Sequence, residues 1–181
     1  MSIQPHVNKP TINKIPHINI NNPITKNNTQ FRKHNCIQLK INNITNNKPS
    51  NSGIINLDSG NQIPFPVISG KFYKQLKSLT IIPKHIKLKK SNYNVESANQ
   101  SPMKISGILQ YPLVFSNDNL KFTFNDFLIM DNLSTDFNFG KAILDILKTK
   151  WEFGKPNVTV LESDVKLCSQ TRETLENIKF S

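Results

Sequence analysis

The strongest candidate for chemistry in this chain of 181 residues is the tripeptide Asp58-Ser59-Gly60, which interrupts the apolar run Gly53–Leu57. A carboxylate held next to a buried segment can act as a general acid or base. Aspartate, serine and glycine are also ordinary turn residues, so the tripeptide by itself does not distinguish an active site from a turn. Its meaning depends on the elements that position it.

Other patterns that mark reactive or metal-binding sites are missing from the sequence. Cys36 and Cys168 lie far apart, and the pair of His34 and Cys36 cannot complete a tetrahedral zinc site. We therefore expect two free or buried thiols in a reducing compartment. There is no phosphate-binding glycine loop with a following lysine and no nucleophile elbow. We expect neither a metal nor another cofactor.

Composition divides the chain into a head, a body and a tail. Residues 1–35 are rich in Asn, Lys and Pro, whereas residues 36–161 hold most of the Phe, Leu, Ile and Val. Residues 1–35 have too little apolar surface to form a packed core, so we expect a disordered head. We interpret residues 162–181 as a polar tail. No apolar run resembles a signal peptide or a membrane span, so we expect an intracellular, cytoplasmic protein without a membrane partner.

The formal net charge of +11 permits a nucleic-acid partner. The lysines are spread along the chain, and the densest run, Lys84–Lys90, alternates charged and apolar residues. This alternation predicts a solvated edge strand in which His85 lies at the surface. Weak, salt-dependent contact of the basic head with nucleic acid stays open.

Apolar periodicity predicts mostly strands. The predicted strands are 36–41, 53–57, 67–68, 86–95, 108–115 and 120–130, with a last hairpin formed by 151–153 and 158–160; the predicted helices are 71–79 and 141–147. Phe72, Leu76 and Leu79 should share one face of the first helix, and Ile143, Leu144 and Leu147 should face inward from the second. This order of elements indicates an all-β domain.

Several pieces follow one another in a fixed order within residues 36–161. They are the strand Ile37–Asn43, the run Ile54–Gly60, the pair Val67-Ile68 and the segment Phe72–Leu76, then a turn of Ala98, Asn99 and Gln100 with Gly107 after it, and Phe127–Met130 followed by Phe139-Gly140 and Ala142–Leu144. Together they resemble one subunit of a retropepsin, the dimeric aspartic protease of retroviruses and retrotransposons. The resemblance lies in the order and spacing of the set.

The resemblance implies a closed β-barrel lobe with one short C-terminal helix, and Asp58 in the place of the catalytic aspartate. Such an enzyme needs two carboxyls, because one must ionise to activate a water while the other stays protonated to polarise the peptide carbonyl. This chain contains a single Asp-Ser-Gly. The second carboxyl would come from a second copy in a symmetric homodimer, which needs no metal.

The resemblance also assigns supporting roles. Ser59 would hydrogen-bond across the dimer axis, Gly60 would allow a tight turn, and Gly140 would permit close packing behind the catalytic loop. The hairpin around Ala98-Asn99-Gln100 would form a flap over the substrate. The substrate would be an extended peptide, with a retroelement polyprotein as its source.

The chain departs from the family in ways that favour an alternative. Asn61 and Asn138 replace residues that are usually small or apolar, Gln100 replaces a common glycine, and the loop after Gly60 is longer and contains prolines. These departures would suit an inactive module that binds peptides or dimerises. A basic nucleic-acid-binding protein is the second alternative.

Overall fold

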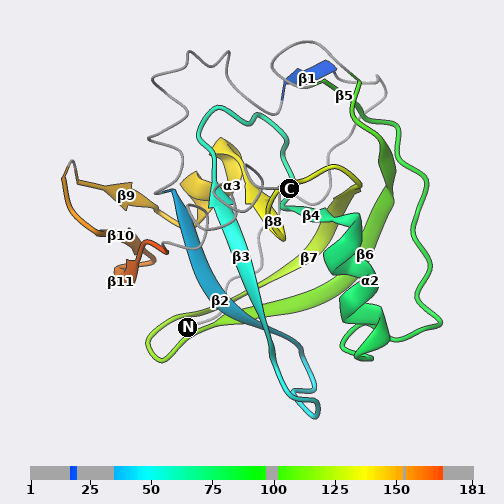
Figure 1. The fold of residues 1–181 in the computed structure, drawn as a ribbon, viewed down its shortest axis with the longest axis horizontal. Helices are drawn as coiled ribbons and strands as arrows, with labels where there is room; N and C mark the ends of the chain where they lie inside the picture. Colours follow the sequence, from blue (N-terminus) through cyan, green and yellow to red (C-terminus); the bar gives the residue numbers. More distant parts are fainter. Residues whose placement is uncertain (1–16, 20–34, 97–101, 153, 169–181) are drawn as a thin grey trace, which may run out of the picture.

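Six strands close into a barrel in the order β2-β3-β8-β4-β7-β6 (Figure 1). The computed structural model describes residues 17–19, 35–96, 102–152 and 154–168. The barrel strands are β2 Cys36–Asn43, β3 Asn51–Leu57, β4 Val67–Ser69, β6 Ile105–Ser116, β7 Lys121–Met130 and β8 Phe137–Phe139. The predicted all-β fold with a closed barrel is confirmed.

Alternating side chains close the first part of the barrel. In β2, Ile37, Leu39 and Ile41 point into the core, whereas Gln38 and Lys40 are exposed. Strand β2 pairs antiparallel with both β3 and β6, and β6 pairs antiparallel with β7. The alternation that predicted these strands therefore separates the interior from the solvent.

The centre of the barrel is built from phenylalanine. Phe115 of β6 is fully buried, and its ring centroid lies between 4.9 and 6.1 Å from five other rings. Those five belong to Phe122, Phe124, Phe127, Phe137 and Phe139. Aromatic pairs in edge-to-face or offset contact add stability beyond the area they bury. This cluster packs β6, β7 and β8 against one another in the core.

The feature that positions the candidate site is the parallel pairing of β3 with β8. Ile55 lies opposite Phe137, and Leu57 lies opposite Phe139. Because the two strands run in the same direction, they end side by side. The residues that follow them, Asp58 and Gly140, are therefore neighbours. A second parallel pair, β4 with β7, and the antiparallel pair of β4 with β8 complete this side of the barrel.

Two helices of the described residues flank the barrel, α2 (Gly70–Ser78) and α3 (Lys141–Ile146). In α3, Ile143 and Leu144 are buried, as predicted, and so is Leu147 just after it. In α2, Phe72 and Leu76 are buried, but Leu79 is 47% exposed. The prediction for Leu79 was wrong because this residue is the C-cap, where the helical period ends.

The prediction of a strand over 86–95 was also wrong, and so was the edge strand at Lys84–Lys90. Only β5 (Asn94–Glu96) is a strand there, and the basic run makes a single bridge, between Lys89 and Ile108. Instead, the Lys77 ammonium donates to the carbonyls of Lys84 and Ile86, at 3.3 and 2.9 Å. The alternation arises because apolar side chains of this loop pack on the core.

A smaller sheet of three strands, β11-β10-β9, follows the barrel. The predicted last hairpin is confirmed by the antiparallel pair of β9 (Lys150–Trp151) and β10 (Asn157–Val160). Strand β11 (Ser163–Lys166) pairs with β10, so the expected boundary at residue 161 falls inside a hairpin. The Cys168 N–H donates to the Cys36 carbonyl at 2.7 Å and joins this sheet to β2.

Most of the predicted head and the remainder of the tail lie outside the described residues. Within the head, strand β1 (His17–Asn19) pairs in parallel with β5 (Figure 1). In the described part of the chain, neither helix has the length and apolar character needed to cross a bilayer.

Candidate functional site

The Asp58 turn begins where β3 ends. The Asp58 N–H donates to the Phe139 carbonyl at 2.9 Å, which continues the β3–β8 pairing by one residue. The Asn61 N–H donates to the Asp58 carbonyl at 3.0 Å and closes a β-turn, while the Gly60 N–H donates to Asp58 Oδ1 at 3.0 Å. Asp58 is 7% exposed, and Ser59 at the tip of the turn is exposed. The carboxyl is thus sheltered, and the Gly60 N–H orients it.

Asn61 holds the far end of this turn with its backbone and its side chain. Its carbonyl accepts the Lys141 N–H at 2.8 Å, and its Oδ1 accepts the Ile63 N–H at 2.8 Å. Its Nδ2 donates to Asn138 Oδ1 at 2.6 Å. Asn61 is fully buried, and Asn138 is 5% exposed. Two departures from the retropepsin pattern are therefore in direct contact with each other.

Gly140 leaves no room for a side chain behind the turn. A Cβ built on Gly140 would overlap the Asn61 carbonyl oxygen and would lie 2.9 Å from Asn61 Cγ. The φ of Gly140 is −82°, so the backbone conformation itself is open to any residue. Close approach, and not backbone freedom, is the reason for glycine at this position.

The loop after Gly60, which carries the extra prolines, packs inward. Ile63, Phe65 and Val67 are buried and form a second apolar cluster with Val95 of β5 and Met130. This cluster lays β5, the strand that leads into the predicted flap, against the segment that follows the Asp58 turn. Strand β5 and the segment after the Asp58 turn thus share one small core.

The Tyr93 ring stacks edge-on against Phe65, with centroids 5.3 Å apart, next to this cluster. Burial raises the pKa of Tyr93 to about 12. Its hydroxyl oxygen is buried and has no hydrogen-bond partner within the described residues. The phenol therefore contributes packing here, and its hydroxyl is an energetic cost.

The predicted flap residues Ala98, Asn99 and Gln100 lie outside the described residues. The chain on both sides of them is described, and it reverses direction. The Met103 N–H donates to the Val95 carbonyl at 2.9 Å, and Glu96 bridges antiparallel to Pro102.

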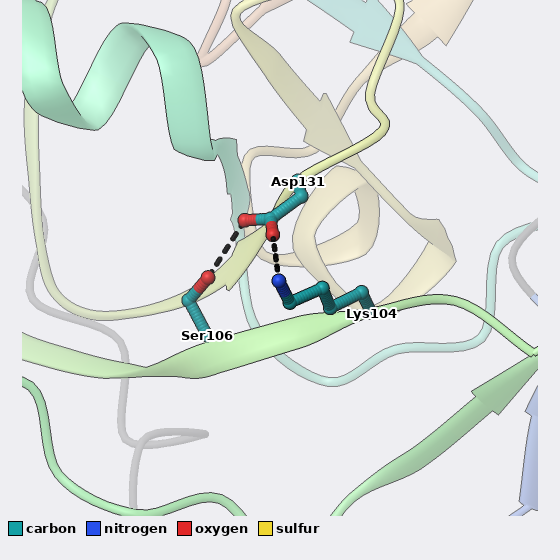
Figure 2. Close-up of polar contacts among 3 residues, drawn as sticks. All are labelled: Lys104, Ser106 and Asp131. Atoms are coloured by element: carbon teal, nitrogen blue, oxygen red, sulfur yellow. Dashed lines mark hydrogen bonds and ion pairs between the residues drawn. The ribbon is translucent and has the colours of Figure 1, made fainter.

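Asp131, just after β7, secures the strand that leaves this hairpin (Figure 2). Its carboxylate accepts a hydrogen bond from Ser106 Oγ at 2.7 Å and pairs with the Lys104 ammonium at 3.4 Å. The hydrogen bond from the Ser106 hydroxyl, together with the hydrogen bond and positive charge of Lys104, lowers the pKa of Asp131. Gly70 admits this carboxylate, because a Cβ there would lie 2.7 Å from Asp131 Oδ1.

No cluster of three or more His, Cys, Asp or Glu side chains that could hold a metal occurs among the residues that the structure describes. The chemistry available at the Asp58 turn is that of a carboxyl group whose Oδ1 accepts the Gly60 N–H.

Comparison with known proteins adds little to this geometry. No family model matches the chain, and no curated protein matches it. Among solved structures, it is similar to the retroviral protease-like domain of Ddi1 from Leishmania major. That match has 12% sequence identity and a TM-score of 0.45, and it covers 73% of this chain and 92% of the other. A similarity this distant says nothing about activity.

Sequence reasoning missed the link between Asn61 and Asn138 and the donation from Lys141 to Asn61. Both asparagines stood out as polar residues at positions expected to be apolar or small. A signal was present, since two such departures that flank one predicted site can compensate each other. Their separation of 77 positions hid the contact.

Proposed function

We propose that this protein is an aspartic endopeptidase that acts as a homodimer, with Asp58 from each subunit activating one water for peptide-bond hydrolysis. The paired carboxyls would share a proton, so that one abstracts a proton from the water while the other polarises the substrate carbonyl. The substrate is an extended peptide, and a retroelement polyprotein is the source that the sequence resemblance suggests.

The observation that carries the proposal is the sheltered Asp58 carboxyl at the end of β3. It sits in an Asp-Ser-Gly turn that Phe139 and Lys141 hold by backbone hydrogen bonds at 2.9 and 2.8 Å. A turn braced in this way suits a carboxyl that must meet its symmetry mate in a fixed geometry. The exposed Ser59 at the tip of the turn leaves its hydroxyl accessible to a second subunit.

The deciding experiment compares the full chain with Asp58→Asn in a cleavage assay on a peptide library read by mass spectrometry. We expect cleavage in the parent, with an optimum at acidic pH because one carboxyl must stay protonated, and loss of cleavage in the variant. Asp118→Asn, in an exposed turn, is the matched control and should cleave normally. Cleavage that persists in Asp58→Asn refutes the proposal.

Solution mass gives an independent test, because a strict monomer cannot assemble two Asp58 carboxyls. A protein that dimerises, does not cleave and fails to bind a statine-type transition-state mimic would instead be an inactive peptide-binding or dimerising module. The asparagine pair weakens one reason for that alternative, because Asn61 and Asn138 satisfy each other and do not leave a buried polar group unpaired.

A further inference from the structure

Two buried asparagines join the Asp58 turn to strand β8 through their side chains. The bond from Asn61 Nδ2 to Asn138 Oδ1 is 2.6 Å long, and both residues are buried. Burying an amide costs free energy unless it is hydrogen-bonded, so each asparagine needs the other. An apolar pair could fill the same space without this requirement. The polar pair must therefore contribute something other than filling space.

The bond restrains the turn that presents Asp58. Asn61 donates its N–H to the Asp58 carbonyl and accepts the Lys141 N–H, and its Oδ1 accepts the Ile63 N–H. Moving Asn61 would strain bonds to the turn, to the following loop and to α3 at once. The Phe139 carbonyl accepts the Asp58 N–H. Both ends of the turn are therefore hydrogen-bonded to the same short segment, where β8 ends and α3 begins.

We propose that Asn61 and Asn138 are a positioning pair that sets the orientation of the Asp58 carboxyl. Hydrogen bonds are directional, whereas apolar contacts are not, so the amide pair can define an angle that packing alone leaves loose. Its effect on turnover rests on the proposed protease function. Its effect on Asp58 itself does not.

The test uses Asn61→Ala, Asn138→Val and the double variant in the full chain. Asn61→Ala leaves the buried Asn138 amide without its Asn61 partner, and Asn138→Val leaves Asn61 Nδ2 without its acceptor. Each single change should lower Tm by roughly 2–12 °C. The double variant roughly conserves side-chain volume and removes the unpaired amide of Asn138. It should therefore melt above Asn61→Ala, which establishes that the site is filled again.

Two readouts separate positioning from stability. The first is the titration midpoint of the Asp58 carboxyl, followed by carbon-13 NMR. We expect it to be displaced in the single variants and to stay displaced in the double variant. The second is turnover of a cleaved peptide, in which kcat should fall about 10–100-fold with little change in KM. A double variant with the parental midpoint and parental kcat overturns the positioning role.

Asn43→Ala is the matched control. Asn43 is also buried, and its Nδ2 donates to the Ile81 carbonyl at 3.0 Å, at the opposite end of the β2–β3 pair from Asp58. It should lose stability and leave the Asp58 titration unchanged. An equal displacement in Asn43→Ala would overturn the proposal by tracing the effect to general destabilisation.

The two proposals fail in different ways. A parent chain without cleavage, combined with a displaced Asp58 midpoint in the double variant, refutes the protease and supports the positioning pair. Cleavage by the parent, combined with parental titration and turnover in the double variant, supports the protease and refutes the positioning pair.

Discussion

Replacing Gly140 with alanine tests whether close approach at the Asp58 turn requires glycine. The new Cβ would overlap the carbonyl oxygen of Asn61, which is backbone and cannot rotate away. Either Asn61 or the start of α3 must shift. The hydrogen bond from the Lys141 N–H to that carbonyl, now 2.8 Å long, would then lengthen or break.

The expected cost has three parts. Inserting a methyl group into a packed site costs about 1–3 kcal/mol, and weakening one backbone hydrogen bond costs about 1 kcal/mol more. Alanine also restricts the unfolded chain, which returns about 0.4–1 kcal/mol, because the Gly140 φ of −82° suits any residue. The net loss is about 1–3.6 kcal/mol, which corresponds to a fall in Tm of roughly 2–14 °C for a chain of this size.

Thermal unfolding and amide hydrogen exchange measure this effect together. Exchange of the Asn61 and Lys141 amides should speed up more than exchange in the β6–β7 hairpin. Gly154→Ala is the control, because no atom lies within 4 Å of its Cβ position and its only cost comes from a φ of +80°. The reasoning is refuted by a Gly140→Ala protein with unchanged Tm and unchanged exchange at Asn61 and Lys141.

Three further predictions follow from other described contacts. Tyr93→Phe should raise stability by about 1 kcal/mol in a denaturant titration, because it removes a buried hydroxyl without a partner among the described residues. Ser69→Ala should destabilise by about 0.5–2 kcal/mol, because Ser69 Oγ accepts the Phe72 N–H at the start of α2, at 3.0 Å. Burial raises the pKa of Asp136 above its ordinary 3.8, so the folded state binds more protons than the unfolded state does. The stability that Asp136 contributes should be full below pH 3.8 and be lost as pH rises through the folded pKa. Asp136→Asn should flatten this dependence of the unfolding free energy on pH.

Each of these has a matched control. Tyr73→Phe is the control for Tyr93, because the Tyr73 hydroxyl is not both buried and without a hydrogen-bond partner. Ser78→Ala is the control for Ser69, because it removes a hydroxyl from the exposed end of α2. Both should change stability less than their counterparts. Asp118→Asn, at an exposed position, removes the same charge and is the control for Asp136→Asn. A loss of stability in Tyr93→Phe would point to a bonded hydroxyl, and an unchanged slope in Asp136→Asn would contradict the burial effect.

The strands of the barrel were largely predictable because their pattern is local. The alternation of Ile37, Leu39 and Ile41 predicted β2, and the apolar segments 108–115 and 120–130 predicted β6 and β7. The same rule failed at Lys84–Lys90. Alternation records which side chains are buried, and it does not record whether a neighbouring strand accepts the backbone hydrogen bonds. There, the Lys77 ammonium donates hydrogen bonds to two of the carbonyls.

The order of amino acids was enough to predict the apolar periods, the turns between them and an Asp-Ser-Gly placed directly after an apolar run. These properties depend on residues close in the chain. A strand's alternation of apolar and polar side chains, or a glycine in a turn, can be recognised without knowing its distant partners. The parallel pairing of β3 and β8, by which the two strands end together, depends on contacts between distant segments and became visible in the folded chain. That pairing brings Asn61 to Asn138, and it turns two polar residues that would be costly when buried alone into a hydrogen-bonded pair beside Asp58.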